Sequence, residues 1–62
     1  MSYNKPYADG AASYQGQTAS IETNGGSTLP WSIVLSDGRR LCDCGSYAAA
    51  AVEFERRGLV AV

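Results

Sequence analysis

The residues best suited to chemistry are two cysteines that flank one aspartate, in the segment Cys42-Asp43-Cys44. Thiolates are nucleophiles and zinc ligands, so the pair could supply half of a tetrahedral zinc site that a two-fold dimer completes. On a strand both thiols would share one face with Cα atoms roughly 6.5 Å apart, near the upper limit for a disulfide, so we expect reduced thiols. We favour the simpler interpretation that both are small buried side chains beneath a helix. A redox role is the remaining alternative.

Catalysis would need a base that this sequence lacks. The chain contains no histidine, which is the commonest general base and metal ligand in proteins. The cysteines and serines that could act as nucleophiles have no basic partner at a recognisable spacing, because arginine cannot accept a proton. We therefore predict a protein that is not an enzyme and that carries no cofactor and no metal.

Two arginine pairs, Arg39-Arg40 and Arg56-Arg57, could form a small phosphate-binding patch if the fold brings them together. Arg56 and Arg57 also suit the carboxyl end of a helix, where the helix dipole favours cations. The formal net charge is −1, so no global field attracts nucleic acid or an anionic membrane. A small nucleic-acid-binding regulator that uses both arginine pairs is kept as the alternative function.

The elements that must position these residues begin with a hairpin. Asp37-Gly38 is a strong signal for a two-residue hairpin loop between two apolar segments. Such a loop predicts five cross-strand pairs: Leu35 with Arg40, Val34 with Leu41, Ile33 with Cys42, Ser32 with Asp43 and Trp31 with Cys44.

The predicted register divides the hairpin into an apolar and a polar face. The apolar face collects the side chains that suit a core, which are Trp31, Ile33, Leu35, Cys42 and Cys44. Polar residues surround Val34 and Leu41 on the other face, where we expect both to be exposed. This polar face is therefore a candidate contact surface.

A helix follows the hairpin. Ser46 is a good N-cap and Gly58 suits the left-handed position after a last turn, which predicts a helix over residues 47–57. Helical periodicity directs one stripe toward the sheet, made of Tyr47, Ala50, Ala51 and Phe54. The run of alanines in this segment lets the helix approach the sheet closely.

Two further strands complete the predicted fold. Residues 14–23 carry β-forming but few apolar side chains, so we expect a strand that lies at an edge or is polar on both sides. It ends at Asn24-Gly25, a type I′ turn signal, and residues 24–28 are predicted to form a flexible turn. Residues 59–62 are short and apolar, and we place them as a last strand after the helical crossover. The predicted fold class is α+β, a small antiparallel sheet in the order β-β-β-α-β with one helix packed on one face. Chains near ~60 residues have a modest core, which keeps a homodimer open.

Residues 1–13 show no helical or strand period, and we interpret them as a flexible amino-terminal arm before a single domain over residues 14–62. Tyr3 and Tyr7 are the large side chains of the arm, and they either attach it to the domain or wait for a partner. No apolar run approaches the ~20 residues that cross a bilayer, and residues 1–6 lack the pattern of a secretory signal. We therefore expect no membrane partner and a cytoplasmic protein.

In general type the chain resembles the very small accessory proteins of phages and mobile elements, of which the anti-CRISPR proteins are the best-known group. The resemblance rests on the 62-residue length from Met1, the α+β unit around residues 45–58, the tyrosine-bearing arm and the lack of catalytic residues. It implies a phage-encoded inhibitor in the host bacterial cytoplasm. Such an inhibitor binds a bacterial defence complex, such as a CRISPR effector complex, and blocks it by occupying its surface.

The sequence thus predicts a small protein-binding module with three candidate contact elements, which are the hairpin tip, the polar hairpin face and the arm. The candidate partner-binding residues, together with the arginine pairs of the alternative function, are Tyr3, Tyr7, Val34, Asp37, Arg39, Arg40, Leu41, Arg56 and Arg57. A third hypothesis is a self-assembling module that pairs through an unfilled sheet edge.

Overall fold

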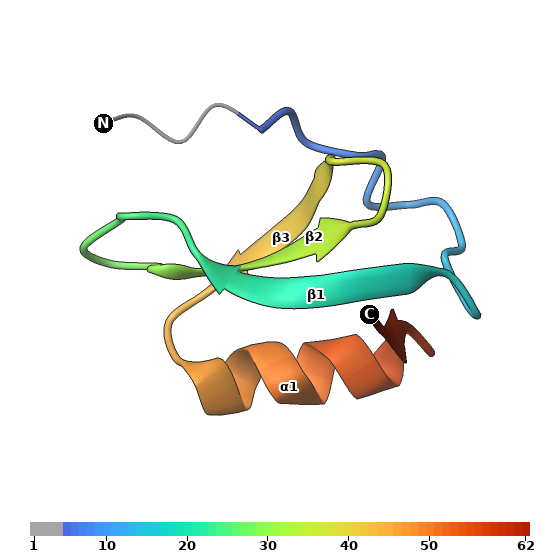
Figure 1. Ribbon diagram of the computed structural model, residues 1–62. Helices are drawn as coiled ribbons and strands as arrows, with labels where there is room; N and C mark the ends of the chain where they lie inside the picture. The colour runs from blue at the N-terminus through green and yellow to red at the C-terminus, as the bar shows by residue number, and fades with distance from the viewer. Residues whose placement is uncertain (1–4) are drawn as a thin grey trace.

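The computed structural model describes residues 5–62 and shows a four-stranded sheet with one helix packed on one of its faces (Figure 1). Along the chain the elements are β1 (Thr18–Thr23), β2 (Trp31–Leu35), β3 (Arg40–Cys44), α1 (Tyr47–Arg56) and β4 (Val60–Ala61). The predicted α+β class and element order are confirmed. From residue 5 the described chain begins on the side of the sheet opposite α1 (Figure 1). Tyr3, one of the candidate partner-binding residues, lies outside the described residues.

The sheet is mixed. Its strand order is β3-β2-β1-β4, and β4 runs parallel to β1 while the other two pairs are antiparallel. The direction follows from the chain path, because β2 reverses between β1 and β3, and α1 returns the chain so that β4 repeats the direction of β3. The β1–β4 pair is therefore a parallel ladder in a sheet that we expected to be antiparallel.

β1 lies inside the sheet, so the edge position, one of the two predicted alternatives for this strand, is wrong. Within residues 5–62, β4 pairs with Thr18 and Ala19, so this end of β1 has strands on both sides. Ala19 is fully buried as a result. The strand also begins later than predicted, because residues 14–17 form a turn in which Gln17 N donates to Tyr14 O at 2.9 Å.

The bounds of α1 agree with the prediction to within one residue. Ser46 caps the first turn, where its Oγ accepts from Ala49 N at 3.1 Å, and Gly58 follows the last turn with φ of +66°. Ala50 is fully buried, because a methyl side chain lets the helix backbone approach the sheet. Among residues 5–62 no helix is long and apolar enough to cross a membrane.

The core lies between α1 and the sheet. Its buried apolar side chains are Ala19, Ile33, Leu35, Leu41, Ala50 and Leu59. Tyr47 was predicted to join them, but its side chain is 56% exposed. It is the first residue of α1 and packs edge-on against the half-buried Trp31, with ring centroids 5.3 Å apart. Tyr47 therefore presents most of its ring to the surface.

The connection between β1 and β2 covers residues 24–30, slightly longer than the flexible turn predicted over residues 24–28, and the predicted type I′ turn at Asn24-Gly25 is wrong. That turn needs positive φ at both Asn24 and Gly25, but the positive φ values within residues 5–62 belong to glycines, with Gly25 at +80°. Asn24 closes the loop instead. Its N donates to Pro30 O and its Nδ2 to Leu29 O, both at 2.8 Å, and its Oδ1 accepts from Gly26 N at 2.7 Å.

Candidate functional site

The hairpin of β2 and β3 has a three-residue loop, where the sequence predicted two. Gly38 N donates to Leu35 O and Leu35 N donates to Arg39 O, both at 2.9 Å, and Gly38 has φ of +90°. These bonds define a turn followed by a left-handed glycine, the other common use of an Asp-Gly pair in hairpins. The longer loop shifts the register by one residue at the tip.

A β-bulge at Leu41 shifts the register back. Val34 pairs with Arg40 and Ile33 with Cys42, which leaves Leu41 as an extra residue on β3. The predicted pairs beyond the bulge, from Ile33–Cys42 to Trp31–Cys44, are therefore confirmed. The predicted pairs Val34–Leu41 and Leu35–Arg40 are wrong, because they lie between the loop, which displaces the register by one position, and the bulge, which restores it.

The bulge also decides which side chains are buried. Leu41 is 5% exposed and belongs to the core beneath α1, together with Ile33 and Leu35. Val34, which pairs with Arg40, is 3% exposed. The expectation that Val34 and Leu41 stand exposed on the hairpin is therefore wrong, and neither offers a partner a contact surface.

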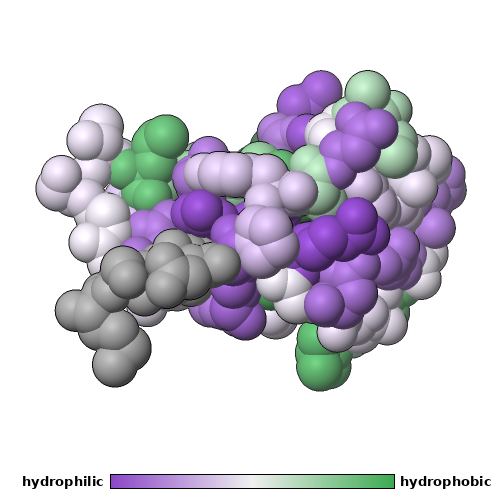
Figure 2. Space-filling view, turned by 90° about the horizontal axis from the view of Figure 1, so that it is seen from above, coloured by the Kyte–Doolittle hydropathy of each residue, from purple (hydrophilic) through white to green (hydrophobic). Residues whose placement is uncertain are grey.

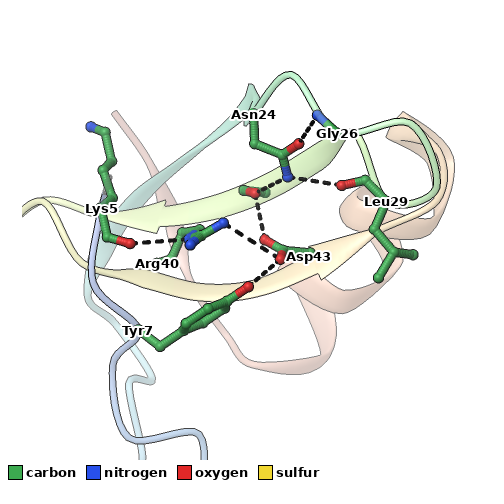
Figure 3. A network of polar contacts seen from close by, with 8 residues as sticks. Lys5, Tyr7, Asn24, Gly26, Leu29, Arg40 and Asp43 are labelled. Carbon is green, nitrogen blue, oxygen red and sulfur yellow. Dashed lines mark hydrogen bonds and ion pairs between the residues drawn. The ribbon is translucent and has the colours of Figure 1, made fainter. Parts of the chain in front are cut away.

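Because of the same shift, Arg40 lies on the face that carries Asp43, opposite α1. Without the bulge, residues 40 and 43 of one strand would point to opposite faces. Arg40 Nη1 lies 3.6 Å from Asp43 Oδ2, and Arg40 Nε donates to Lys5 O at 3.2 Å (Figure 3). The guanidinium carbon also lies 4.1 Å from the ring centroid of Tyr7, which is a cation–π contact.

Asp43 is the centre of this polar cluster, which joins the arm, the hairpin and the β1–β2 loop (Figure 3). Its carboxylate accepts from Ser32 Oγ at 2.6 Å and from the Tyr7 hydroxyl. Ser32 is fully buried and in turn accepts from Asn24 Nδ2 at 2.6 Å. We call Tyr7, Asn24, Ser32, Arg40 and Asp43 the latch cluster.

The electrostatics of the latch cluster keep Asp43 ionised. Desolvation raises the pKa of Asp43, but hydrogen bonds from Ser32 and Tyr7 and the charge of Arg40 outweigh it and hold this pKa below its usual 3.8. The pKa of Tyr7 is raised, first by the hydrogen bond to Asp43. The described side chains contain no buried polar atom without a hydrogen bond, so the cluster is internally satisfied.

The arm is attached through Tyr7, which is the first of the two roles that the sequence left open for this residue. Tyr7 forms a parallel bridge with Arg40. Arg40 N donates to Pro6 O and Ala8 N donates to Arg40 O, both at 2.7 Å. The arm thus binds the outer edge of β3. On the face of the molecule opposite α1, hydrophilic and near-neutral residues predominate over a few hydrophobic ones (Figure 2).

Acid is expected to weaken the fold through Asp43. Its pKa is lowered in the folded state, so the unfolded chain takes up the proton first and the stabilisation is lost as the pH falls below about 4. Urea unfolding followed by Trp31 fluorescence should give a constant free energy from pH 7 to pH 5 and a decline below pH 4. The decline should be smaller in Asp43→Asn. Equal declines in the variant and the wild type would show that Asp43 is not the cause of the acid destabilisation.

Removing one hydroxyl should loosen the arm. In Tyr7→Phe the ring still packs on Arg40, but the hydrogen bond to Asp43 is lost. We expect the amides of Ala8 and Arg40 to exchange with solvent several times faster by NMR, because their bonds hold the arm to β3. Tyr14→Phe, which removes a bond to Asp9 O in the same segment, should leave the Arg40 amide unchanged. Equal Arg40 exchange in the Tyr7 variant and the wild type would show that the hydroxyl does not hold the arm.

The two arginine pairs do not form an open basic patch. Arg39 Nη2 lies 2.7 Å from Asp37 Oδ2 at the hairpin tip, and this ion pair lowers the pKa of Asp37. Arg56 Nη1 and Arg57 Nε lie 3.0 and 3.1 Å from the carboxylate of Glu53. Each arginine therefore has a carboxylate beside it, which weakens attraction to phosphate.

The cysteines are half-buried and pack against the core. Burial, together with the neighbouring Cys44, raises the pKa of the Cys42 thiol to about 11, although Arg57 acts in the opposite direction. A thiol with this pKa stays protonated at neutral pH and is a weak nucleophile and a weak metal ligand. Among the residues from 5 onward, no three His, Cys, Asp or Glu side chains are grouped to hold a metal ion.

A second surface, which the sequence reasoning missed, is an apolar groove between α1 and β1. The groove has a volume of about 320 Å³ and lies where β4 ends, with Ile21 and Phe54 in its walls and Tyr47 and Val62 at its rim. Tyr47 is 56% and Val62 86% exposed. The prediction that Tyr47 belongs to the core concealed this surface. The position of Tyr47 at the first residue of α1, where a side chain is often exposed, was the signal that could have revealed it.

The structure separates the candidate partner-binding residues into groups. Tyr7 and Arg40 meet in the latch cluster, while Asp37 and Arg39 form an exposed pair at the hairpin tip. Arg56 and Arg57 share Glu53 at the carboxyl end of α1. Comparison with protein families, with curated proteins and with solved structures finds no match for this chain.

Proposed function

We propose that this chain is a small non-catalytic protein-binding module that acts by covering a surface of its partner. The observation that carries the proposal is the apolar groove between α1 and β1. Exposed apolar side chains belong to its lining, with Tyr47 56% and Val62 86% exposed. Apolar surface gathered in this way is typical of interaction sites, and tyrosine is enriched where binding energy is concentrated.

The charge distribution favours a protein partner over nucleic acid. Nucleic-acid binding depends on cations that can neutralise phosphates, but the arginines have carboxylates within 4 Å. Lys5 likewise lies 3.6 Å from Glu22. The nucleic-acid-binding alternative is therefore supported less well than protein binding.

The resemblance to anti-CRISPR proteins makes a bacterial CRISPR effector complex the first partner to test. In this proposal the module is a phage-encoded inhibitor, and its groove takes up an element of the effector complex. The bound module would then block the access of nucleic acid to the effector complex, or a conformational step of that complex.

The test uses purified effector complexes in a DNA-cleavage assay with increasing amounts of the wild-type chain. Two variants of α1 form a matched pair, because Tyr47 and Val52 are 56% and 60% exposed but only Tyr47 lines the groove. We expect inhibition by wild type and Val52→Ser, and at least about tenfold weaker inhibition by Tyr47→Ser, since an aromatic hot-spot contact is worth more than about 1.4 kcal/mol. Circular dichroism checks that both variants fold. Absence of binding to every complex tested would overturn the inhibitor role, and equal inhibition by the two variants would remove the groove from it.

A further inference from the structure

One edge of β1 is open where the apolar groove begins. Within residues 5–62, β4 pairs with Thr18 and Ala19, whereas β2 pairs with β1 as far as Thr23. Among the described residues, the stretch over residues 20–23 therefore has a strand on one side only, and its first two residues, Ser20 and Ile21, line the groove.

The register shows which backbone groups face this open edge. Thr18 O accepts from Ser36 N at 2.9 Å, and Asn24 N donates to Pro30 O at 2.8 Å, so the even-numbered residues of this strand bond toward β2. Antiparallel pairing alternates along a strand. The N–H and C=O groups of Ile21 and Thr23 consequently point toward the open edge.

Apolar side chains lie beside these backbone groups. Ile21 on β1 and Phe54 on α1 form walls of the groove, and Tyr47 lies at its rim. Glu55 is the one charged side chain of the lining, which contains no lysine or arginine. Backbone groups at two-residue spacing next to an apolar groove are the requirements for adding a strand to a sheet edge.

We propose that a partner protein binds by adding an extended strand to β1 at Ile21 and Thr23, an inference that rests on the proposed protein-binding function. The strand places an apolar side chain in the groove against Phe54. It carries a lysine or arginine that pairs with Glu55, since the lining has negative charge and no positive charge. Main-chain hydrogen bonds supply affinity, and the groove supplies selection of side chains.

A second copy of this chain fits the same edge less well. Two β1 strands related by a two-fold axis can pair Ile21 of one with Thr23 of the other, and this register sets Glu22 directly opposite its own copy. Like charges directly opposite on neighbouring strands are destabilising. Shifting the register to avoid this contact brings the copy against β4, which occupies the edge beside Ala19, or leaves Ile21 opposite the loop after Asn24.

The test selects peptides from a displayed library of random nine-residue sequences on the full chain. We expect selected peptides to alternate apolar and polar residues and to contain a lysine or arginine. Adding the best peptide to the wild-type chain should protect the amides of Ile21 and Thr23 from hydrogen exchange at least about tenfold, because both become hydrogen-bonded. No enrichment, a consensus without alternation, or protection elsewhere would overturn strand addition.

A backbone variant supplies a matched control. Thr23→Pro removes the N–H that faces the open edge and keeps the ladder to β2, whereas Thr23→Ala keeps that N–H. Relative to the wild type, we expect the proline variant to bind the peptide at least about tenfold more weakly, because it loses one backbone hydrogen bond and the strand geometry that this bond needs. The alanine variant should bind within about twofold of the wild type. If Tyr47→Ser weakens peptide binding and Thr23→Pro does not, strand addition is overturned and the protein-binding function still stands.

The oligomeric state tests the other occupant. If sedimentation shows a dimer and the amide of Ile21 is protected in the absence of peptide, the edge belongs to a second copy and the proposal is overturned.

Discussion

Asp43→Ala is expected to lower the free energy of unfolding by about 2–3 kcal/mol, because it leaves buried polar partners without an acceptor. Ser32, which is fully buried, loses the carboxylate oxygen to which it donates. Arg40 loses its ion pair, and Tyr7 loses the bond that attaches the arm. For a domain of this length, with a total stability on the order of 3–9 kcal/mol, this is a large fraction. Urea unfolding followed by the fluorescence of Trp31, the single tryptophan, measures the loss.

Two variants control this prediction. Asp43→Asn keeps an oxygen that can accept from Ser32 but removes the charge, so its loss should lie between that of wild type and Asp43→Ala. Asp37→Ala removes the exposed partner of Arg39 at the hairpin tip and should change stability little, since solvent screens that pair. If Asp43→Ala and Asp37→Ala have equal effects, the latch cluster does not hold the fold together.

Ile33→Ala is expected to cost about 2–5 kcal/mol, because it removes a fully buried side chain and leaves a cavity between α1 and the sheet. Ile33 is 0% exposed and lies on β2, at the centre of the buried cluster that includes Leu35 and Leu41. A loss of this size is a large fraction of a total stability on the order of 3–9 kcal/mol. Circular dichroism at increasing temperature should show a transition shifted well below that of the wild type.

Two matched controls test the core prediction. One removes less volume at the same buried site, and the other removes side-chain volume at an exposed site. Ile33→Val removes one methylene and should cost only about 0.5–1.5 kcal/mol. Val52→Ala, on the exposed side of α1, should leave the transition nearly unchanged. A cost for Ile33→Ala below about 1 kcal/mol would mean that the helix moves in to fill the space.

Local signals in the sequence predicted α1 and half of the hairpin. Ser46 and Gly58 act on backbone groups within one helical turn, so their effect can be read from neighbouring residues. The register from Ile33 to Trp31 was predicted from the apolar pattern and is correct. It is correct because the three-residue loop and the bulge shift the register in opposite directions and cancel.

The latch cluster could not be predicted, because no local pattern specifies the bulge at Leu41. The bulge lets Leu41 enter the core with Ile33 while Arg40 joins Asp43 on the other face. The bond from Tyr7 to Asp43 spans 36 residues of sequence. Such contacts are selected by the fold as a whole and not by the preferences of either segment.

By itself, the sequence determined the α+β class, the order of the elements, the bounds of the helix and the lack of histidine chemistry, because these depend on residue types and on contacts within a few positions. Only the tertiary structure decided that Val34 and Leu41 are buried, that Tyr7 binds the sheet, and that within residues 5–62 the edge of β1 beyond Ala19 has no strand beside it. These features depend on where β4 ends and on how two one-residue irregularities combine. Their energies come from burial and hydrogen bonds between distant segments, which become definite only when the chain has folded.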